Sequence, residues 1–273
     1  MRKLELGPST KLIEVYNPPV ASRVKPGQFM MVMSEETGER IPLTAADWDA
    51  EKGTVTIVFL EVGASTKKLG LVNEGQDLYH LAGPLGNPTE VGYFGTVVVV
   101  GGGVGIATAY PVARAMKETG NHVVSIVGAR SADKLIFAEE LAKVSDEFIV
   151  TTDDGSRGRR GFVSDALREL LKSGRKVDRV FTVGPTIMMK VVAETTQPFG
   201  VKTVASLNPI MLCGMGMCGG CRVKVGGVVK FACVDGPDFD ANQVDFKELL
   251  ARLSQYKSEE AAALRVLEQG VVA

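Results

Sequence analysis

The four cysteines of this chain lie together between residues 213 and 233. Their spacing is C-x4-C-x2-C-x11-C, so three thiols share one short loop and the fourth follows a predicted hairpin. Four soft, anionic sulfur ligands in this order are typical of a 2Fe–2S cluster. Glycines between the first three cysteines would let the loop turn tightly and aim backbone N–H groups at the cluster. The sequence therefore predicts one metal site, made by Cys213, Cys218, Cys221 and Cys233.

Two other uses of the cysteines fit less well. Structural zinc usually takes two C-x2-C pairs or a mixture of cysteine and histidine, whereas this segment has one such pair and no histidine nearby. Disulfides need an oxidising compartment, and the N-terminal residues lack the layout of a signal peptide. Zinc and disulfides stay as alternatives to the iron–sulfur cluster. A one-electron cluster also needs an electron donor and an acceptor, which the rest of the chain should help to identify.

A glycine-rich loop at 101–105 follows a continuous apolar strand and precedes a helical stretch. Glycines there would let the backbone approach a dinucleotide pyrophosphate, whose charge is attracted to the free N–H groups at a helix start. The match to G-x-G-x-x-G is imperfect, so the loop alone also fits a plain tight turn. The candidate phosphate-binding residues are Gly102, Gly103, Val104 and Gly105.

Further candidates follow the next strands, at the carboxyl edge where open α/β sheets bind ligands. Gly128 and Arg130 end the second strand, where no acidic residue marks a preference for NAD. Both NAD(H) and NADP(H) therefore remain open. The ends of later strands add Asp154, Gly155, Gly184 and Pro185. All of these residue types also favour ordinary turns, which is the alternative interpretation.

The N-terminal part contains short motifs with the chemistry that a flavin dinucleotide requires, a cation for its pyrophosphate and hydrogen-bond donors near its ring. The first motif joins Arg40 to the hydroxyl of Thr44; the second, at 63–66, offers N–H groups and hydroxyls; the third spans 83–86. Each motif alone is an ordinary loop sequence, so their order carries the prediction. The candidate flavin-binding residues are Arg40, Pro42, Leu43, Thr44, Val62, Gly63, Ser65, Thr66, Gly83, Pro84, Leu85 and Gly86.

Size and composition narrow the class of protein. A chain of 273 residues is long enough for two domains that each bury a core. The net charge of -1 argues against a nucleic-acid or anionic-membrane binder, and no apolar run reaches the roughly 18 residues of a membrane span. With only two histidines, histidine-based catalysis is not expected. We expect a cytoplasmic protein that binds neither nucleic acid nor membrane.

The hydrophobic pattern predicts the elements that position these residues. Residues 1–94 alternate β-rich runs with turn clusters, which predicts a small antiparallel β-barrel. Residues 95–205 alternate buried strands with helices, which predicts a doubly wound parallel sheet. Residues 206–240 form the cluster segment and 241–273 a helical extension. The expected strands of the second domain are 96–100, 122–127, 148–151, 179–183 and 203–205, and its expected helices are 106–119, 135–142, 163–171 and 186–195.

Apolar residues of the helical extension recur at helical spacing and form one stripe. They are Phe246, Leu249, Leu250, Leu253 and Tyr256. Such a stripe either packs on its own chain or docks a partner subunit, and both interpretations stay open.

Taken in order, these motifs resemble the ferredoxin-NADP reductase superfamily, and more narrowly the iron–sulfur electron-transfer subunits related to that of dihydroorotate dehydrogenase B. The resemblance covers about residues 5–240. Within this group the chain more closely resembles the small subunits of NADH-dependent reduced ferredoxin:NADP⁺ oxidoreductases, also called sulfide dehydrogenase β subunits. The longer 40–44 motif, the 234–240 segment and the helical extension carry that closer likeness. Several members of the closer family have aspartate as the first cluster ligand, where this chain has Cys213.

The resemblance implies an oxidoreductase that moves electrons from NAD(P)H through FAD to the 2Fe–2S cluster. It also implies a heterodimer with a larger flavin and iron–sulfur subunit that is similar to glutamate synthase, with electron bifurcation and with ferredoxin as a substrate of the complex. One alternative is the electron-transfer subunit of dihydroorotate dehydrogenase B; another is a non-enzymatic redox sensor. Hydride transfer between cofactors depends on orientation, so no catalytic side chain is expected.

Overall fold

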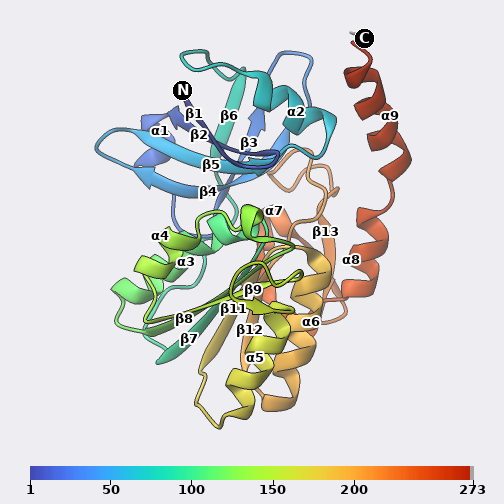
Figure 1. Ribbon diagram of the computed structural model, residues 1–273. Helices are drawn as coiled ribbons and strands as arrows, with labels where there is room; N and C mark the ends of the chain where they lie inside the picture. The colour runs from blue at the N-terminus through green and yellow to red at the C-terminus, as the bar shows by residue number, and fades with distance from the viewer. Residues whose placement is uncertain (271–273) are drawn as a thin grey trace.

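The computed structural model describes residues 1–270, which form two β-sheet units joined through the cysteine-rich segment (Figure 1). The N-terminal unit is a six-stranded antiparallel sheet in the order β1-β2-β5-β4-β3-β6. Its strands are β1 (Arg2–Gly7), β2 (Thr10–Tyr16), β3 (Phe29–Met33), β4 (Ile41–Asp49), β5 (Thr54–Leu60) and β6 (His80–Leu85). Two short helices complete it, α1 (Pro18–Ala21) and α2 (Ala64–Leu71).

The N-terminal sheet differs from the expected barrel in one respect. Its outer strands β1 and β6 pair with β2 and β3 and, within residues 1–270, not with each other, so hydrogen bonds do not close the sheet. The pairing register shifts at 29–31 in β3 and at 45–47 in β4. Such bulges bend and twist a sheet, which brings its apolar faces around one core.

The central unit is a seven-stranded sheet in the order β10-β9-β8-β7-β11-β12-β15. Its strands are β7 (Thr96–Gly102), β8 (His122–Ala129), β9 (Glu147–Thr152), β10 (Arg159–Arg160), β11 (Arg179–Val183), β12 (Lys202–Ser206) and β15 (Asp238–Asp240). Neighbouring strands are parallel except at the edge, where β15 runs antiparallel to β12. The expected sheet was wholly parallel. The mixed edge arises because the cluster segment returns to pair with β12 and covers its open side.

Helices cover both faces of the central sheet, as a doubly wound arrangement requires. Val97 and Val99 of β7 face α3 (Gly105–Glu118) and α4 (Ala138–Lys143), whereas Val98 and Val100 face α5 (Val163–Lys172) and α6 (Thr186–Thr196). All four valines are fully buried. Burial on both faces explains why this strand is a continuous apolar run instead of an alternating one.

The helix expected at 135–142 begins later, at Ala138. Phe137 has a left-handed backbone conformation, with φ of 54°, and a 3₁₀ turn at Ala132–Lys134 precedes it. A non-glycine residue in that conformation interrupts a right-handed helix. Apolar spacing could not reveal this break, because Phe137 still packs against the core beside α3 and α4.

The cluster segment packs between the two sheets, around an apolar core of its own. It contains β13 (Arg222–Val225), β14 (Val228–Phe231) and α7 (Ala232–Asp235) before β15. Cys221 and Cys233 share one apolar cluster with Phe29 and Met31 of β3 and with Met189 of α6. The segment therefore touches the N-terminal sheet on one side and the central unit on the other.

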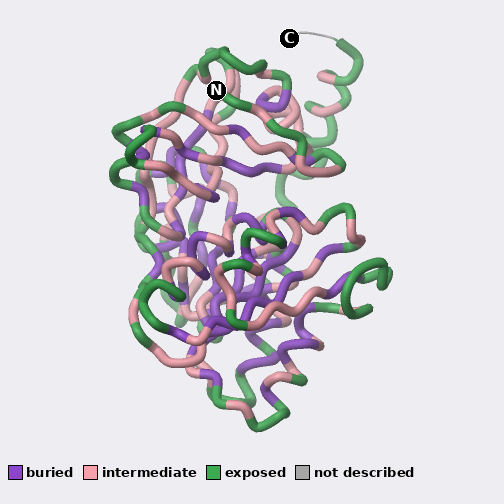
Figure 2. The backbone as a smooth tube through the Cα atoms, turned by 60° about the vertical axis from the view of Figure 1, so that its left-hand side comes forward, coloured by how far each residue is buried: buried purple, intermediate pink, exposed green. Residues whose placement is uncertain are grey.

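The C-terminal extension forms two helices, α8 (Phe246–Leu253) and α9 (Lys257–Glu268). Phe246 and Leu249 are buried in the core of the cluster segment and Leu253 packs against it, whereas Tyr256 lies beyond the end of α8 and is exposed. Phe246, Leu249 and Leu253 of the apolar stripe are thus internal packing, which rules out partner docking through these three side chains. α9 has no buried residue (Figure 2) and runs back toward α2 (Figure 1). Lys67 of α2 pairs with Glu268 of α9.

The two sheets also meet directly, through α3 and β4. Arg114 of α3 binds the Asp47 carboxylate at 2.8 Å and lies over the ring of Trp48. Ala107 of α3 and Ala46 of β4 share a small buried cluster. The helix that follows the glycine loop is therefore fixed against the strand that follows Arg40. None of the helices within residues 1–270 has the length and apolar character to cross a membrane.

Candidate cofactor site

The cysteine loop brings its sulfurs together with backbone N–H donors around them. Cys213, Cys221 and Cys233 are buried and Cys218 is exposed. The Sγ atoms of Cys221 and Cys233 are 3.2 Å apart. Backbone N–H groups of the loop point at the sulfurs: Gly216 donates to Cys233 at 3.1 Å, and Met215 and Gly220 donate to Cys213 and Cys218 at 3.4 Å. Such donors favour thiolates and the sulfur atoms of a cluster.

The acid–base properties of the thiols follow from these contacts. Burial alone would raise the pKa of Cys213, but N–H groups of the loop and the Cys218 thiol lower it to about 6. Burial and the adjacent Cys221 raise the pKa of Cys233 to about 12. The raised pKa of Cys233 disfavours its thiolate unless a cation lies beside the sulfur. A metal centre with four thiolate ligands meets that requirement.

The sulfurs are grouped in twos, which bears on the identity of the metal. Cys221 contacts Cys233, and Cys213 interacts with Cys218. Across residues 1–270, no three His, Cys, Asp or Glu side chains gather around a single metal position. A tetrahedral zinc needs its ligands around one point, whereas a two-iron cluster takes two cysteines on each iron. The arrangement fits 2Fe–2S better than zinc.

The cluster loop lies directly against two strands of the N-terminal sheet. Gly214 has φ of 75°, and a Cβ there would lie 2.6 Å from Cγ of Met31 and 3.0 Å from Cδ1 of Leu85. Only glycine allows this approach. Beyond the last cysteine, Asn87 hydrogen-bonds the carbonyls of Gly236 and Val234. The loop thus contacts β6 and the turn after it, where predicted flavin-binding residues lie.

The predicted flavin residues gather on neighbouring elements. Pro42, Leu43 and Thr44 of β4 pair with β3, and β6, which holds the 83–85 motif, pairs with the other side of β3. The start of α2 lies close to the 39–40 turn, because the hydroxyl of Ser65 donates to Glu39. The first N–H groups of an α-helix have no partner within the helix. These groups and Arg40 therefore lie at the same end of the sheet.

Arg40 itself shows the strongest sign of a missing anion. Its Nε and Nη2 atoms are buried and have no hydrogen-bond partner within residues 1–270. Buried guanidinium donors without a partner are costly, and a pyrophosphate would satisfy them. The Thr66 hydroxyl, by contrast, already has partners within the chain, because it accepts hydrogen bonds from the N–H groups of Val62 and Gly63 at 3.1 Å. The contribution of Thr66 to a phosphate site would then be structural.

The predicted nucleotide residues meet at the carboxyl ends of β7, β8 and β11. Gly103 donates to the carbonyl of Gly128 at 2.9 Å. A Cβ on Gly105 would lie 2.6 Å from the Val183 carbonyl oxygen, and one on Gly184 would lie 2.9 Å from that of Gly102. These glycines allow the first turn of α3 to pack tightly on β11. No atom lies within 4 Å of the position that a Cβ on Gly103 would take, so the outer side of the loop is open to a phosphate.

Three predicted residues lie further out on the rim of this edge. Arg130, Asp154 and Gly155 are exposed, and the Asp154 N–H donates to the Arg130 carbonyl at 3.2 Å. Hydrogen bonds from Ser156 hold the pKa of Asp154 below its usual value. Pro185 is exposed at the start of α6.

Some contacts at the site carry no sequence signal. Asn208 accepts a hydrogen bond from the Thr186 hydroxyl at 3.0 Å, which links the start of the cluster segment to the start of α6. Arg252 of α8 donates to the carbonyl of Gly220 at 3.0 Å. Both pairs are distant in sequence and match no motif, so only the fold could reveal them.

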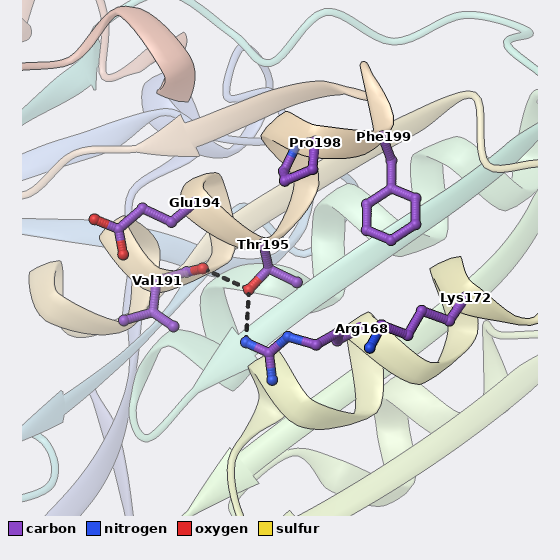
Figure 3. A pocket seen from close by; sticks show the side chains of 7 residues that line it. All are labelled: Arg168, Lys172, Val191, Glu194, Thr195, Pro198 and Phe199. Atoms are coloured by element: carbon purple, nitrogen blue, oxygen red, sulfur yellow. Dashed lines mark hydrogen bonds between the residues drawn. The ribbon is translucent and has the colours of Figure 1, made fainter.

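A separate groove of about 310 Å³ lies between α5 and α6 (Figure 3). It holds none of the cysteines, glycine-loop residues or flavin motifs, so it is not part of the cofactor site. The residues that line it are Arg168, Lys172, Val191, Glu194, Thr195, Pro198 and Phe199.

Comparison with known proteins agrees with this geometry. Residues 208–245 match the iron–sulfur cluster binding domain of dihydroorotate dehydrogenase B, and residues 99–194 match the oxidoreductase NAD-binding domain. The chain is 50% identical to a Thermotoga maritima homologue of the dihydroorotate dehydrogenase B electron transfer subunit, over 90% of this chain and 86% of that protein. A probable subunit of the same kind from Methanopyrus kandleri is 35% identical, over 83% of each chain.

Among solved structures, the chain is similar to one of the NADH-dependent reduced ferredoxin-NADP oxidoreductase, described for flavin-based electron bifurcation. The two are 46% identical with a TM-score of 0.93, over 98% of this chain and 96% of the other. Phthalate dioxygenase reductase, at 14% identity and a TM-score of 0.60, shares the fold alone.

Proposed function

Because this chain belongs to the family of dihydroorotate dehydrogenase B electron transfer subunits, we propose that it passes electrons from NAD(P)H through FAD to a single 2Fe–2S cluster. The chain is an electron-transfer oxidoreductase subunit with an NAD-binding domain and an iron–sulfur domain. We assign flavin binding to residues 1–94, nucleotide binding to 95–205 and the cluster to 206–240.

The contact of Gly214 with Met31 and Leu85 carries the proposal. It places the cluster loop against β3 and β6, which are the strands that adjoin the predicted flavin motifs. Electron transfer needs cofactors that are held close together and do not move apart. The tight fit at Gly214, with no room for a Cβ, meets that need.

Each group of residues has a defined task in this proposal. Arg40 and the start of α2 bind the flavin pyrophosphate, and β4 and the 83–86 motif flank the ring. The glycine loop and the start of α3 bind the nucleotide pyrophosphate. The N–H donors of the cysteine loop stabilise negative charge on the cluster. When bound, the flavin exchanges electron pairs with the nicotinamide and single electrons with the cluster.

The electrons leave, we propose, through an apolar face around Cys218 to a larger flavin and iron–sulfur subunit. Cys218 is exposed, and the same segment of the chain carries several large apolar side chains that are also exposed. The exposed ones are Leu212, Met215, Met217, Val228, Val229 and Val234. Large exposed apolar side chains concentrated in one segment are typical of protein interfaces. This face takes the place of the α8 stripe as the proposed docking surface, because Phe246, Leu249 and Leu253 of that stripe pack on the chain itself.

The wider reaction follows from the similarity to the bifurcating enzyme. We infer that the complex oxidises or reduces ferredoxin together with NAD(H) and NADP(H), and that the larger subunit holds the low-potential carriers. This chain has four cysteines, all used by one cluster, and therefore has none left for a 4Fe–4S centre.

The test separates the activity of this chain from that of the complex. The isolated chain should oxidise NADH with ferricyanide as acceptor and should not reduce ferredoxin. Reduction of ferredoxin by the isolated chain with NADH alone would contradict the proposal. Failure of the chain to oxidise NADH after it has been loaded with flavin and cluster would contradict it too.

A second candidate is an electron transfer subunit of dihydroorotate dehydrogenase B, because several similar proteins carry that name. Purification of the native complex distinguishes the two. A larger flavin and iron–sulfur subunit supports the first function, and a dihydroorotate-oxidising subunit supports the second.

A further inference from the structure

Arg252 connects the C-terminal extension to the cysteine loop. It lies in the last turn of α8, and its Nη2 donates to the carbonyl of Gly220 at 3.0 Å. Gly220 stands between Cys218 and Cys221, and its own N–H points at the Cys218 sulfur. The guanidinium is thus one hydrogen bond away from the loop that holds two predicted cluster ligands.

The position of Arg252 is fixed by the packing of its helix. Phe246 and Leu249 are buried in the core around the cysteines, and Asp245 caps the helix by accepting the Glu248 N–H at 2.9 Å. A crevice of only about 10 Å³ remains beside Arg252, between α8 and the loop. It is lined by Pro209, Ile210, Gly220, Leu249, Arg252 and Leu253. Arg252 is therefore partly buried and held against the loop.

Arg252 forms no salt bridge within residues 1–270, where its side chain makes a single hydrogen bond, to Gly220. Another arginine near the loop, Arg222, is exposed, and its Nη1 is 3.5 Å from the Gly219 carbonyl. Solvent screens an exposed charge strongly and a partly buried one less. Of these two arginines, Arg252 is the partly buried one, so solvent screens its charge less.

We propose that the charge of Arg252 raises the reduction potential of the cluster. Reduction adds one electron, which increases the negative charge at the sulfurs, and a nearby fixed cation stabilises that product. This inference rests on the proposed cluster at the four cysteines. It gives the α8 extension a role in electron transfer, because the helix holds the cation in place.

The size of the effect can be bounded. At an effective dielectric constant of about 20, a unit charge about 10 Å from a redox centre changes the equilibrium between its reduced and oxidised forms by roughly tenfold. Salt reduces this effect. We expect about a fivefold change in the ratio of reduced to oxidised cluster at a fixed potential. For a one-electron couple, this corresponds to about 40 mV at 59 mV per tenfold.

The experiment is a dithionite titration of the full-length, cluster-loaded chain, followed by the electron paramagnetic resonance signal of the reduced cluster. Arg252→Gln should lower the potential by that amount. Arg252→Lys, which keeps the charge, and Lys247→Gln, which removes a charge from the exposed side of the same helix, should each change the ratio less than about twofold. Equal potentials in Arg252→Gln and Lys247→Gln would overturn the inference, as would equal shifts in Arg252→Gln and Arg252→Lys.

A second variant covers the case in which Arg252→Gln does not retain iron. Glu248 lies one helical turn before Arg252, so its carboxylate opposes the arginine's charge. Glu248→Gln should raise the reduction potential of the cluster. The ratio of reduced to oxidised cluster at a fixed potential should then increase about twofold. A potential that stays the same or falls would contradict the inference. If the wild-type chain itself holds no iron and sulfide, the proposed function fails; if the cluster is present and the potentials do not differ, only the role of Arg252 fails.

Discussion

Replacing Gly214 by alanine should loosen the contact between the cluster loop and the N-terminal sheet. Gly214 has φ of 75°, and the added Cβ would lie 2.6 Å from Cγ of Met31, a fully buried side chain of β3. A left-handed backbone costs a non-glycine residue about 1–2 kcal/mol, and overpacking a core adds about 1–3 kcal/mol. The alanine variant should therefore lose roughly 2–5 kcal/mol of stability in the cluster segment.

Gly227→Ala is the matched control. Gly227 lies in the turn between β13 and β14 with φ of 80°, and nothing lies within 4 Å of the position of its Cβ. It therefore carries the backbone cost alone, about 1–2 kcal/mol. The difference between the two variants measures the contact with Met31 and Leu85.

The assay has two parts, thermal loss of the visible cluster spectrum and the rate of cluster reduction after mixing with NADH. Gly214→Ala should lose the cluster at a lower temperature than Gly227→Ala and reduce it more slowly, with flavin content unchanged. Equal stabilities and equal rates in the two variants would refute the claim that this contact fixes the cluster beside the flavin site.

Other predictions follow from single residues and from α8. Arg40→Ala removes a charged hydrogen-bond donor worth about 1.5–3 kcal/mol, so FAD affinity measured by dialysis should fall roughly 10- to 150-fold; unchanged retention would exclude Arg40 from the pyrophosphate site. Cys218→Ser should lose most of its iron, and a full complement of iron in that variant would remove Cys218 from the ligands. Burial raises the pKa of Asp238 to about 6, against hydrogen bonds from Thr89 and Ser206. Because the unfolded carboxyl titrates near 3.9, stability should fall by roughly 2–3 kcal/mol as pH rises from about 4 through about 6; urea unfolding of Asp238→Asn should lack this slope, and an unchanged slope would assign it elsewhere. Removal of residues 257–273 should leave iron content intact, whereas removal of 244–273 deletes two buried side chains and should cost about 5 kcal/mol or more; similar iron content in the two truncated chains would contradict the internal packing of α8.

The local parts of the site could be predicted from the sequence, because they depend on residues that are close in the chain. The spacing of the cysteines, the glycine loop after β7 and the alternation of strands and helices are all of this kind. Even the two-sided burial of Val97 to Val100 is visible as a continuous apolar run.

The parts that depend on distant contacts could not be predicted. The pairing of β15 with β12 is set by the return of the cluster segment, and no local pattern marks it. The stripe on α8 has the same spacing whether it covers its own core or a partner, so only the fold distinguishes the two. The contact of Arg252 with Gly220 joins residues from two separate elements and has no motif.

The central claim is that this one chain holds both a flavin and a two-iron cluster. The most direct test is to count iron, acid-labile sulfide, zinc and FAD per chain in protein purified without oxygen. The account predicts about two iron, two sulfide and one FAD, with no zinc. One zinc per chain without sulfide, or a chain that retains iron and sulfide but never binds flavin, would contradict it.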